Sequence, residues 1–95
     1  MFNFQKQPSE IYRIKNDFTG VLETGETLAS KTVVATLNDV DVTSTVISSS
    51  EIDGDIIYIT VKAGTNGNVY KITLEATTSD SNVFEEDLLM IVKEL

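Results

Sequence analysis

Two groups of carboxylates are the residues best suited to chemistry. Glu51, Asp53 and Asp55 cluster on one expected turn, and Asp39 and Asp41 on another. Paired carboxylates can hydrolyse glycosidic bonds, and Ca²⁺ prefers clustered carboxylate oxygens. However, a glycosidase needs a deep cleft, which a small domain rarely builds, and the twelve-residue calcium-loop pattern is missing. We therefore interpret these residues as solvated turn carboxylates, with calcium binding as the alternative.

Other catalytic chemistry is limited by the residues that the chain lacks. The 95 residues include no histidine and no cysteine, so triads, thiolate nucleophiles and thiolate zinc sites are excluded. The segment 64–67 has two glycines but no following lysine or helix, so it is not a phosphate-binding loop. We expect no enzyme, no catalytic or metal-binding residue and no cofactor.

Charge and hydropathy restrict the partners. The net charge is −8, and such a surface repels phosphate backbones, so we expect no nucleic-acid partner. No apolar run approaches the ~20 residues of a membrane helix. The start of the chain also lacks the layout of a signal peptide. We therefore expect no membrane partner and no passage through the general secretion route.

The segment 64–76 gives the strongest indication of the fold. Gly64 and Gly67 form a glycine-rich corner, after which Tyr70, Ile72 and Leu74 fall on one face of a strand. Immunoglobulin-like sandwiches enter their penultimate strand in this way, with a tyrosine whose hydroxyl bonds to nearby backbone. We therefore predict an all-β, immunoglobulin-like antiparallel sandwich, with Gly64, Gly67, Tyr70 and Ile72 as its structural corner.

The remaining segments agree with a single domain of six to seven short strands. Residues 11–15, 27–37, 42–49 and 55–62 have β-branched or alternating patterns, and turn signals separate them. Asp53-Gly54 is a strong hairpin dipeptide. The last segment, 83–95, fits both helical and strand spacing, and its pattern alone slightly favours a helix. Its place in the sandwich favours a final strand paired with residues 69–77, and we predict a strand.

The N-terminal residues are expected to lie outside the sandwich. We predict a flexible arm at residues 1–9 and a sandwich domain at residues 10–95. A frayed terminus is the simpler interpretation of the arm. The alternative is a docking arm, because Phe2 and Phe4 alternate with polar residues and would be unfavourable to leave exposed.

Four patches of sequence resemble a known family. They are Pro8-Ser9-Glu10, residues 22–30, the corner at 61–73, and Thr77-Thr78 with the closing strand. Over about residues 7–93 the chain is similar to immunoglobulin-like structural proteins of tailed bacteriophages and prophages, described as fibre–tail adaptors.

This resemblance implies a structural or adaptor protein of a phage or prophage virion, at the tail or the head–tail junction. It implies docking to other virion proteins, a possible homo-oligomeric ring, and assembly in the bacterial cytoplasm. An immunoglobulin-like recognition module of a bacterial surface protein, binding carbohydrate or a host protein, is the alternative function. Exposed aromatic residues sharing one face would favour that alternative.

Overall fold

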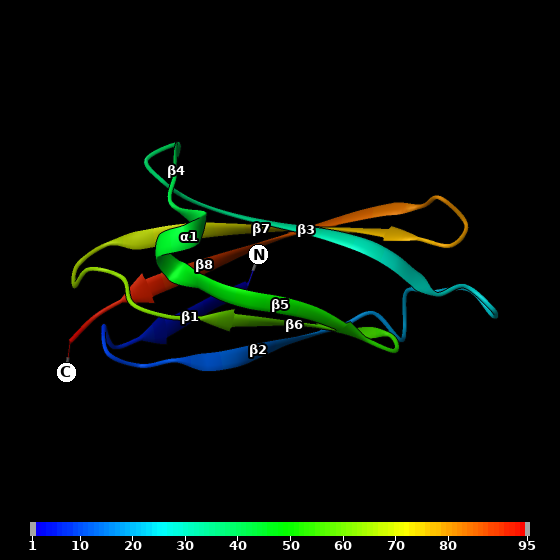
Figure 1. Ribbon diagram of the computed structural model, residues 1–95, viewed down its shortest axis with the longest axis horizontal. Helices are drawn as coiled ribbons and strands as arrows, with labels where there is room; N and C mark the ends of the chain where they lie inside the picture. Colours follow the sequence, from blue (N-terminus) through cyan, green and yellow to red (C-terminus); the bar gives the residue numbers. More distant parts are fainter. Residues whose placement is uncertain (1, 95) are drawn as a thin grey trace.

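The computed structural model describes residues 2–94 and consists of two facing β-sheets (Figure 1). The elements in chain order are β1 (Phe2–Lys6), β2 (Tyr12–Asp17), β3 (Leu28–Leu37), β4 (Val40–Asp41), α1 (Thr43–Val46), β5 (Ile47–Asp53), β6 (Ile56–Val61), β7 (Val69–Thr78) and β8 (Val83–Val92). The predicted all-β sandwich in a single domain is confirmed. None of the described residues belongs to a helix long and apolar enough to cross a membrane.

One sheet has five strands in the order β1-β8-β7-β3-β4, and the other has three in the order β2-β6-β5. Every pairing is antiparallel except that of β1 with β8, which is parallel. The described chain therefore has more strands than the predicted six to seven. The additional ones are β1, which was expected to be an arm, and β4, which has two residues.

The core follows from alternation along the central strands. In β6 the buried residues are Ile57, Ile59 and Val61, and each polar or half-buried neighbour faces outward. In β7 the same period buries Tyr70, Ile72, Leu74, Ala76 and Thr78. Side chains of successive strand residues point to opposite faces, so this pattern places one apolar face of each sheet against the other.

Two short hairpins have the turn residues that their geometry requires. The β5–β6 loop has Gly54 at its first central position with φ +61°, as a type II′ turn needs. The β3–β4 loop has Asn38 and Asp39, with φ of +51° and +67°. Positive φ at both central positions is typical of a type I′ turn, whose twist matches that of the flanking strands.

The strand predicted at residues 42–49 is wrong in its first half. Residues Thr43–Val46 form the single helical turn α1, and the strand β5 begins only at Ile47. Asp41 causes this difference, because its Oδ1 accepts hydrogen bonds from the Thr43 backbone N–H at 2.9 Å and hydroxyl at 2.7 Å. Such local bonds offset the β propensity of threonine and valine.

The predicted strand at the C-terminal end is confirmed as β8. Its pairing with β7 runs from Val69 opposite Ile91 to Thr77 opposite Val83. This pairing buries Leu88, Met90 and Val92, which share one face of a strand. Burial against a neighbouring strand therefore outweighed a pattern that, in the isolated segment, slightly favours a helix.

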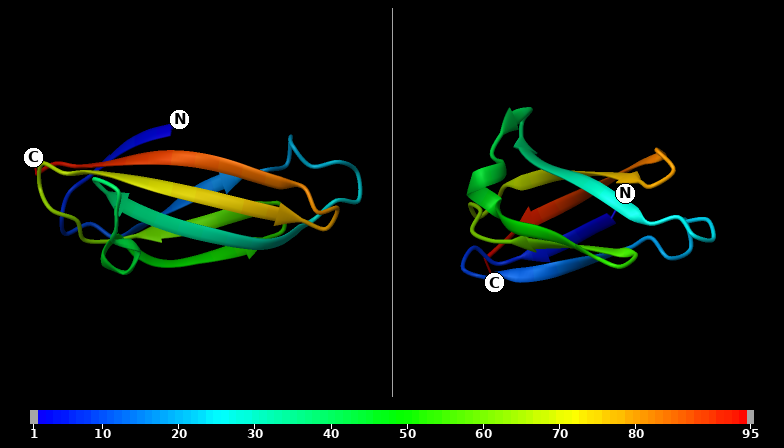
Figure 2. Two further views of the ribbon diagram at one scale, coloured as in Figure 1. Left: turned by 90° about the horizontal axis from the view of Figure 1, so that it is seen from above. Right: turned by 45° about the vertical axis from the view of Figure 1, so that its right-hand side comes forward.

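The molecule is elongated, with principal extents of 44 × 23 × 20 Å. The strands run along the long axis, and the connecting loops gather at its two ends (Figure 2). We call the end that contains residues 62–68 the corner end. We call the end that contains the β7–β8 turn and Glu26 the carboxylate end.

Candidate docking surfaces

Tyr70 closes the corner end of the sandwich. It is the second residue of β7 and is only 2% exposed. Its hydroxyl accepts a hydrogen bond at 3.0 Å from the backbone N–H of Thr65, five residues upstream. The ring therefore packs in the core, while its polar end fixes the loop that precedes the strand.

Gly64 and Gly67 shape this loop in different ways. Both have positive φ, +96° and +92° respectively, which side-chain-bearing residues rarely adopt. A Cβ at Gly64 would lie 2.7 Å from Cγ2 of Val92, whereas one at Gly67 would meet nothing within 4 Å. Gly64 is thus required by close packing as well as by backbone conformation. Ile72, the fourth residue proposed for the corner, is fully buried in the core of β7.

Lys6 is a second determinant of the corner end. Its side chain is 2% exposed, and its Nζ donates to the backbone carbonyls of Gln7, Pro8 and Ala63. Burial lowers the pKa of Lys6, and the nearby Glu10 and Tyr70 partly oppose this effect. The three carbonyls satisfy the ammonium group that the chain removes from water. Lys6 therefore ties β1 to the loop at Ala63.

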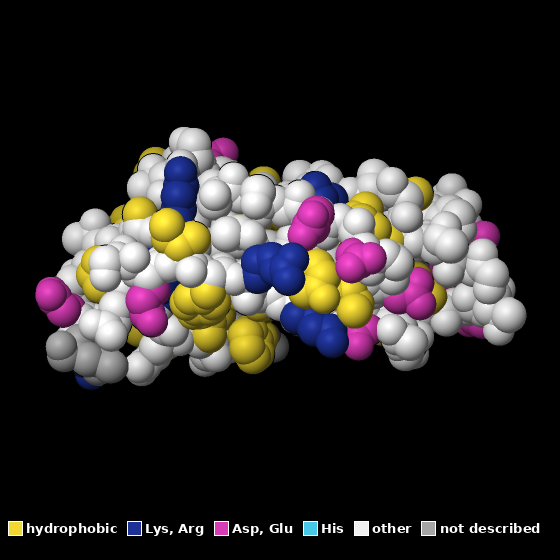
Figure 3. Space-filling model, turned by 60° about the horizontal axis from the view of Figure 1, so that its bottom comes forward, with side chains coloured by type: hydrophobic (Ala, Val, Ile, Leu, Met, Phe, Trp, Pro, Cys, Tyr) yellow, Lys and Arg dark blue, Asp and Glu magenta, His cyan; other side chains and the backbone are white. Residues whose placement is uncertain are grey.

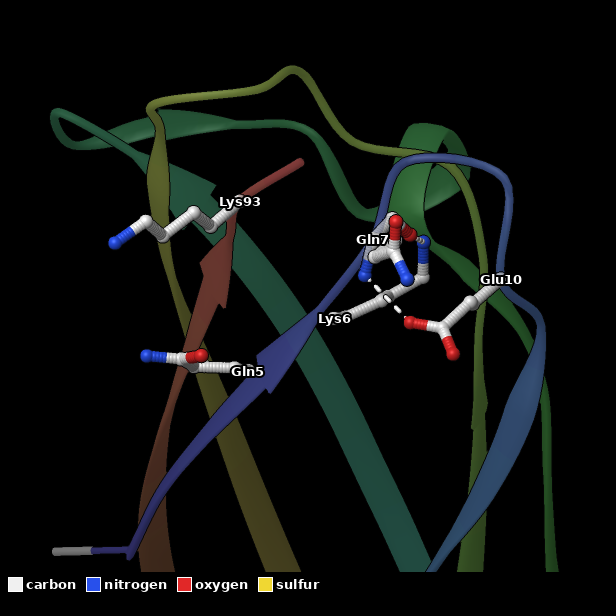
Figure 4. A pocket seen from close by; sticks show the side chains of 5 residues that line it. All are labelled: Gln5, Lys6, Gln7, Glu10 and Lys93. Atoms are coloured by element: carbon white, nitrogen blue, oxygen red, sulfur yellow. Dashed lines mark hydrogen bonds between the residues drawn. The ribbon is translucent and has the colours of Figure 1, made fainter. Parts of the chain in front are cut away.

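A small pocket lies beside Lys6 and is lined by Gln5, Lys6, Gln7, Glu10 and Lys93. Figure 4 shows Gln5 and Lys93 extending to one side of β1, while Lys6 points to the other. Glu10 accepts a hydrogen bond at 2.6 Å from the backbone N–H of Gln7, which holds the turn after β1. Lys6 already donates to three carbonyls, so its ammonium group is used within the fold. We therefore interpret this pocket as part of the turn after β1 rather than as a ligand site.

Residues 2–6 differ from the flexible arm expected for residues 1–9, of which Met1 lies outside the described residues. Phe2–Lys6 form the strand β1, which pairs in parallel with Leu88–Val92 of β8. Alternation places Phe2, Phe4 and Lys6 on the inner side of this strand. The buried lysine and the open edge of β8 explain why these residues add a strand to the sheet.

Phe2 and Phe4 contribute to an apolar rim between the two sheets. Their rings stack with centroids 5.9 Å apart, and Phe4 meets the ring of Tyr12 edge-on at 6.1 Å. Phe2 is 50% exposed, and Ile11, which precedes Tyr12 in the chain, is 67% exposed. Hydrophobic side chains gather on the corresponding part of the surface in Figure 3, near the start of β2. We define Phe2, Phe4 and Tyr12 as the aromatic rim.

Glu26 organises the carboxylate end. This side chain is 5% exposed, and it accepts hydrogen bonds from the hydroxyl of Thr78, from Nδ2 of Asn82 and from the backbone N–H of Glu23. These three donors, led by the Thr78 hydroxyl, lower the pKa of Glu26. A single carboxylate therefore connects the β2–β3 loop with the β7–β8 turn.

The turn carboxylates considered for chemistry have structural partners or lie apart. Glu51 pairs with Arg13 at 3.0 Å, and the Arg13 guanidinium lies 4.2 Å from the ring centroid of Tyr58. Asp41 bonds to Thr43, which lowers its pKa. Among residues 2–94, no group of three or more Asp or Glu side chains is placed to hold a metal ion.

The tyrosines also lie apart from one another. Tyr70 is buried, Tyr12 belongs to the aromatic rim, and Tyr58 lies on the outer face of the three-stranded sheet beneath Arg13. The three tyrosines therefore do not share one face, and the aromatic side chains that do lie together are those of the aromatic rim.

Comparison with known proteins adds the decisive observation. Residues 6–90 match the model of the podophage GP4 fiber-tail adaptor protein gp77 family. The chain belongs to this family. Its role is therefore that of a phage structural or adaptor protein. No curated protein matches the chain.

The matched segment of this adaptor-family member begins at Lys6 and ends at Met90, so it spans both buried charges and the whole corner. Sequence reasoning did not single out Lys6 or Glu26. For Lys6 a signal was available, because period-two alternation places it on the same side of β1 as Phe2 and Phe4. Glu26 follows a turn glycine, and only the fold brings Thr78 and Asn82 to it.

Proposed function

We propose that this protein is a non-enzymatic adaptor that works by docking to other proteins of the virion tail or the head–tail region. The observation that carries this proposal is the family match over residues 6–90. A docking domain needs a stable scaffold and surfaces for contact rather than a cleft. The two packed sheets, whose ends are held by Lys6 and Glu26, provide a stable scaffold. The aromatic rim provides one candidate contact surface.

An immunoglobulin-like arrangement supports the same proposal. The neighbouring strands β8, β7 and β3 face β2, β6 and β5, and these correspond to the G-F-C and B-E-D groupings of immunoglobulin domains. The bond between Thr65 and Tyr70 at the start of β7 corresponds to their tyrosine corner. Domains of this kind present sheet faces, edges and end loops to partners, and the fold alone does not decide which one is used.

The charge indicates the chemistry of the partner. With a net charge of −8, free copies repel one another and stay soluble until they meet a more basic surface. We propose that the partners are other tail proteins with basic docking surfaces, that copies are arranged around the tail axis, and that assembly occurs in the cytoplasm of the host bacterium.

The test is a pull-down with individually purified products of the neighbouring tail and portal genes. We expect one of them to be retained by the folded protein, with weaker retention as salt is raised. Gly20→Ala is a matched control, because a Cβ there meets nothing within 4 Å and retention should be unchanged. Retention of none of these products at low salt would contradict the docking role.

A further inference from the structure

The sandwich has several open strand edges, and most of them carry features that discourage pairing with another chain. The part of β3 that does not pair with β4 is an open edge, and it has a register shift between Leu28 and Ser30. Lys31 of this strand lies opposite the buried Ala76, so it is on the inner side of the sheet. The edge strand β5 has a register shift between Ile47 and Ser49. Bulges and inward-pointing charges are devices that protect sheet edges.

The edge strand β2 is protected differently. Arg13, Lys15 and Asp17 alternate along it with inward-facing residues, so an approaching strand meets charges of both signs. The remaining edge, β4, has only two residues, and short strands offer little to pair with.

The edge strand β1 has fewer of these protections over Phe2–Phe4, because its inward-pointing charge, Lys6, lies at the far end of the strand. Its pairing with β8 is regular from Phe2 to Lys6, without a register shift. Its one charged side chain, Lys6, is buried, and Phe2 on its inner side is half exposed. The only proline of the chain, Pro8, follows the strand rather than interrupting it. Thus β1 combines a regular edge with exposed apolar surface.

The hydrogen bonds show which backbone groups of β1 face outward. The carbonyl of Lys6 accepts from the Lys93 N–H, so it faces β8. The carbonyl of Gln5 accepts from the Tyr12 hydroxyl at 3.0 Å, so it faces away from β8. Because this direction alternates along a strand, the N–H and C=O of Asn3 face away from β8 as well. Asn3 thus offers a donor and an acceptor at the open edge.

We propose that β1 pairs antiparallel with β1 of a second copy, with the two-fold axis at Asn3. In this register Asn3 lies opposite Asn3 of the second copy and exchanges two backbone hydrogen bonds with it. Phe2 of each copy then lies opposite Phe4 of the other, which brings the two aromatic rims together. The bond between Tyr12 and Gln5 is kept, because Gln5 is not needed for the central pair.

The charge distribution leaves this edge open to a second copy. Each chain carries a net charge of −8, so two copies repel over most of their surfaces. No carboxylate lies on β1, and the proposed register places no two like charges directly opposite each other. A two-fold contact requires such a self-complementary patch. Because the strand is short, the contact is small and the dimer is weak.

Disulfide trapping tests this register directly. Residues of a hydrogen-bonded antiparallel pair have Cα atoms about 5.5 Å apart, which is within the range for a disulfide. The chain has no cysteine, so Asn3→Cys introduces a single thiol. Under mild oxidation we expect this variant to become a covalent dimer. Ser48→Cys, exposed on the β5 edge, is the matched control and should stay monomeric.

Sedimentation velocity over roughly a hundredfold dilution series tests the unmodified association. We expect the sedimentation coefficient of the wild-type chain to rise with concentration. Asn3→Pro should abolish this rise, because proline removes the outward N–H but none of the bonds to β8. Asn3→Ala keeps the N–H and should associate as the wild type does, and thermal unfolding checks that both variants are folded.

Three results would overturn the inference. They are a wild-type chain that is monomeric throughout the series, an Asn3→Pro variant that is folded yet associates normally, and cross-linking of Ser48→Cys in preference to Asn3→Cys. The inference is independent of the proposed adaptor function. A monomeric protein that a tail protein still retains would contradict the dimer inference but not the adaptor function. A β1 dimer that no tail protein retains would contradict the adaptor function but not the dimer inference.

Discussion

The two ends of the sandwich are closed by one buried charged residue each, but by opposite physical means. At the corner end, Lys6 donates to three backbone carbonyls beside a glycine that has no room for a Cβ. At the carboxylate end, Glu26 accepts from three donors that come from a loop, the end of β7 and the β7–β8 turn. The comparison teaches that the corner end combines hydrogen bonds from a buried charge with close packing at Gly64, whereas the carboxylate end depends mainly on hydrogen bonds to a charge.

Gly64→Ala should give the largest effect, because it attacks the packing of the corner end. Its Cβ would lie 2.7 Å from Val92 on a backbone with φ +96°. Strain and overpacking together should lower the free energy of unfolding by roughly 2–5 kcal/mol. Chemical denaturation measures this change.

Gly67→Ala separates the two contributions to that effect. Its φ is +92°, but a Cβ there meets nothing within 4 Å. Only the conformational penalty remains, and we expect a loss of about 1–2 kcal/mol. Equal losses for the two variants would show that the contact with Val92 is unimportant, and the packing account of the corner end would then be wrong.

Removing the Glu26 carboxylate at the carboxylate end should change how the stability of the fold depends on pH. Because the pKa of Glu26 is lowered from its ordinary value of 4.5 in the folded state, this group stabilises the fold above pH 4.5. That stabilisation disappears as the pH falls through the lowered pKa. Glu26→Gln should therefore be less stable than the wild type at pH 7, and the difference should shrink in acid. Thermal unfolding between pH 7 and pH 3 measures both.

A matched control for this variant is Glu51→Gln, whose carboxylate is largely exposed beside Arg13. We expect little change at pH 7, because exposed ion pairs stabilise only weakly. If Glu26→Gln unfolds in parallel with the wild type at every pH, the buried carboxylate does not organise this end.

Tyr70→Phe should produce a smaller effect at the corner end. The ring remains, but the acceptor for the Thr65 N–H is lost. We expect a loss of about 1 kcal/mol in the free energy of unfolding. Hydrogen exchange at the Thr65 amide should accelerate more than exchange in the middle of β7. An unchanged rate at Thr65 would mean that the hydroxyl does not fix the loop.

The smallest effect concerns Lys6 at alkaline pH. Burial lowers the pKa of this group from 10.5, so the unfolded chain binds the proton more tightly than the folded chain. Stability should therefore rise as the pH increases from the lowered pKa towards 10.5. Lys6→Met should lack this contribution. The measurement is the difference between wild-type and variant unfolding free energies from pH 8 to pH 10.5, and a constant difference would contradict it.

The strands of the core could be predicted from the sequence because alternation there is strict. Tyr70, Ile72 and Leu74 share one face of a long segment, and a helix would scatter them. The turn at Asp41 could not be predicted, because it depends on two hydrogen bonds from one side chain to Thr43. These local bonds outweigh a β-rich pattern.

The connections between distant segments lay beyond sequence reasoning. The contact between Glu26 and Thr78 joins residues 52 positions apart, and that between Lys6 and Ala63 joins residues 57 apart. Nothing local at either position indicates the partner. The parallel pairing of β1 with β8 was missed for a related reason, since a five-residue polar and aromatic segment resembles a loose terminus until a strand edge is available to it.

The most direct test of the central claim is the pull-down with purified products of the neighbouring tail and portal genes. The claim is that a sandwich closed at both ends serves as a docking adaptor. We predict that the wild-type protein retains one of these products at low salt, that Gly20→Ala does so equally, and that Gly64→Ala loses retention in proportion to its unfolded fraction. Retention of none of them by a fully folded wild-type protein would contradict the account.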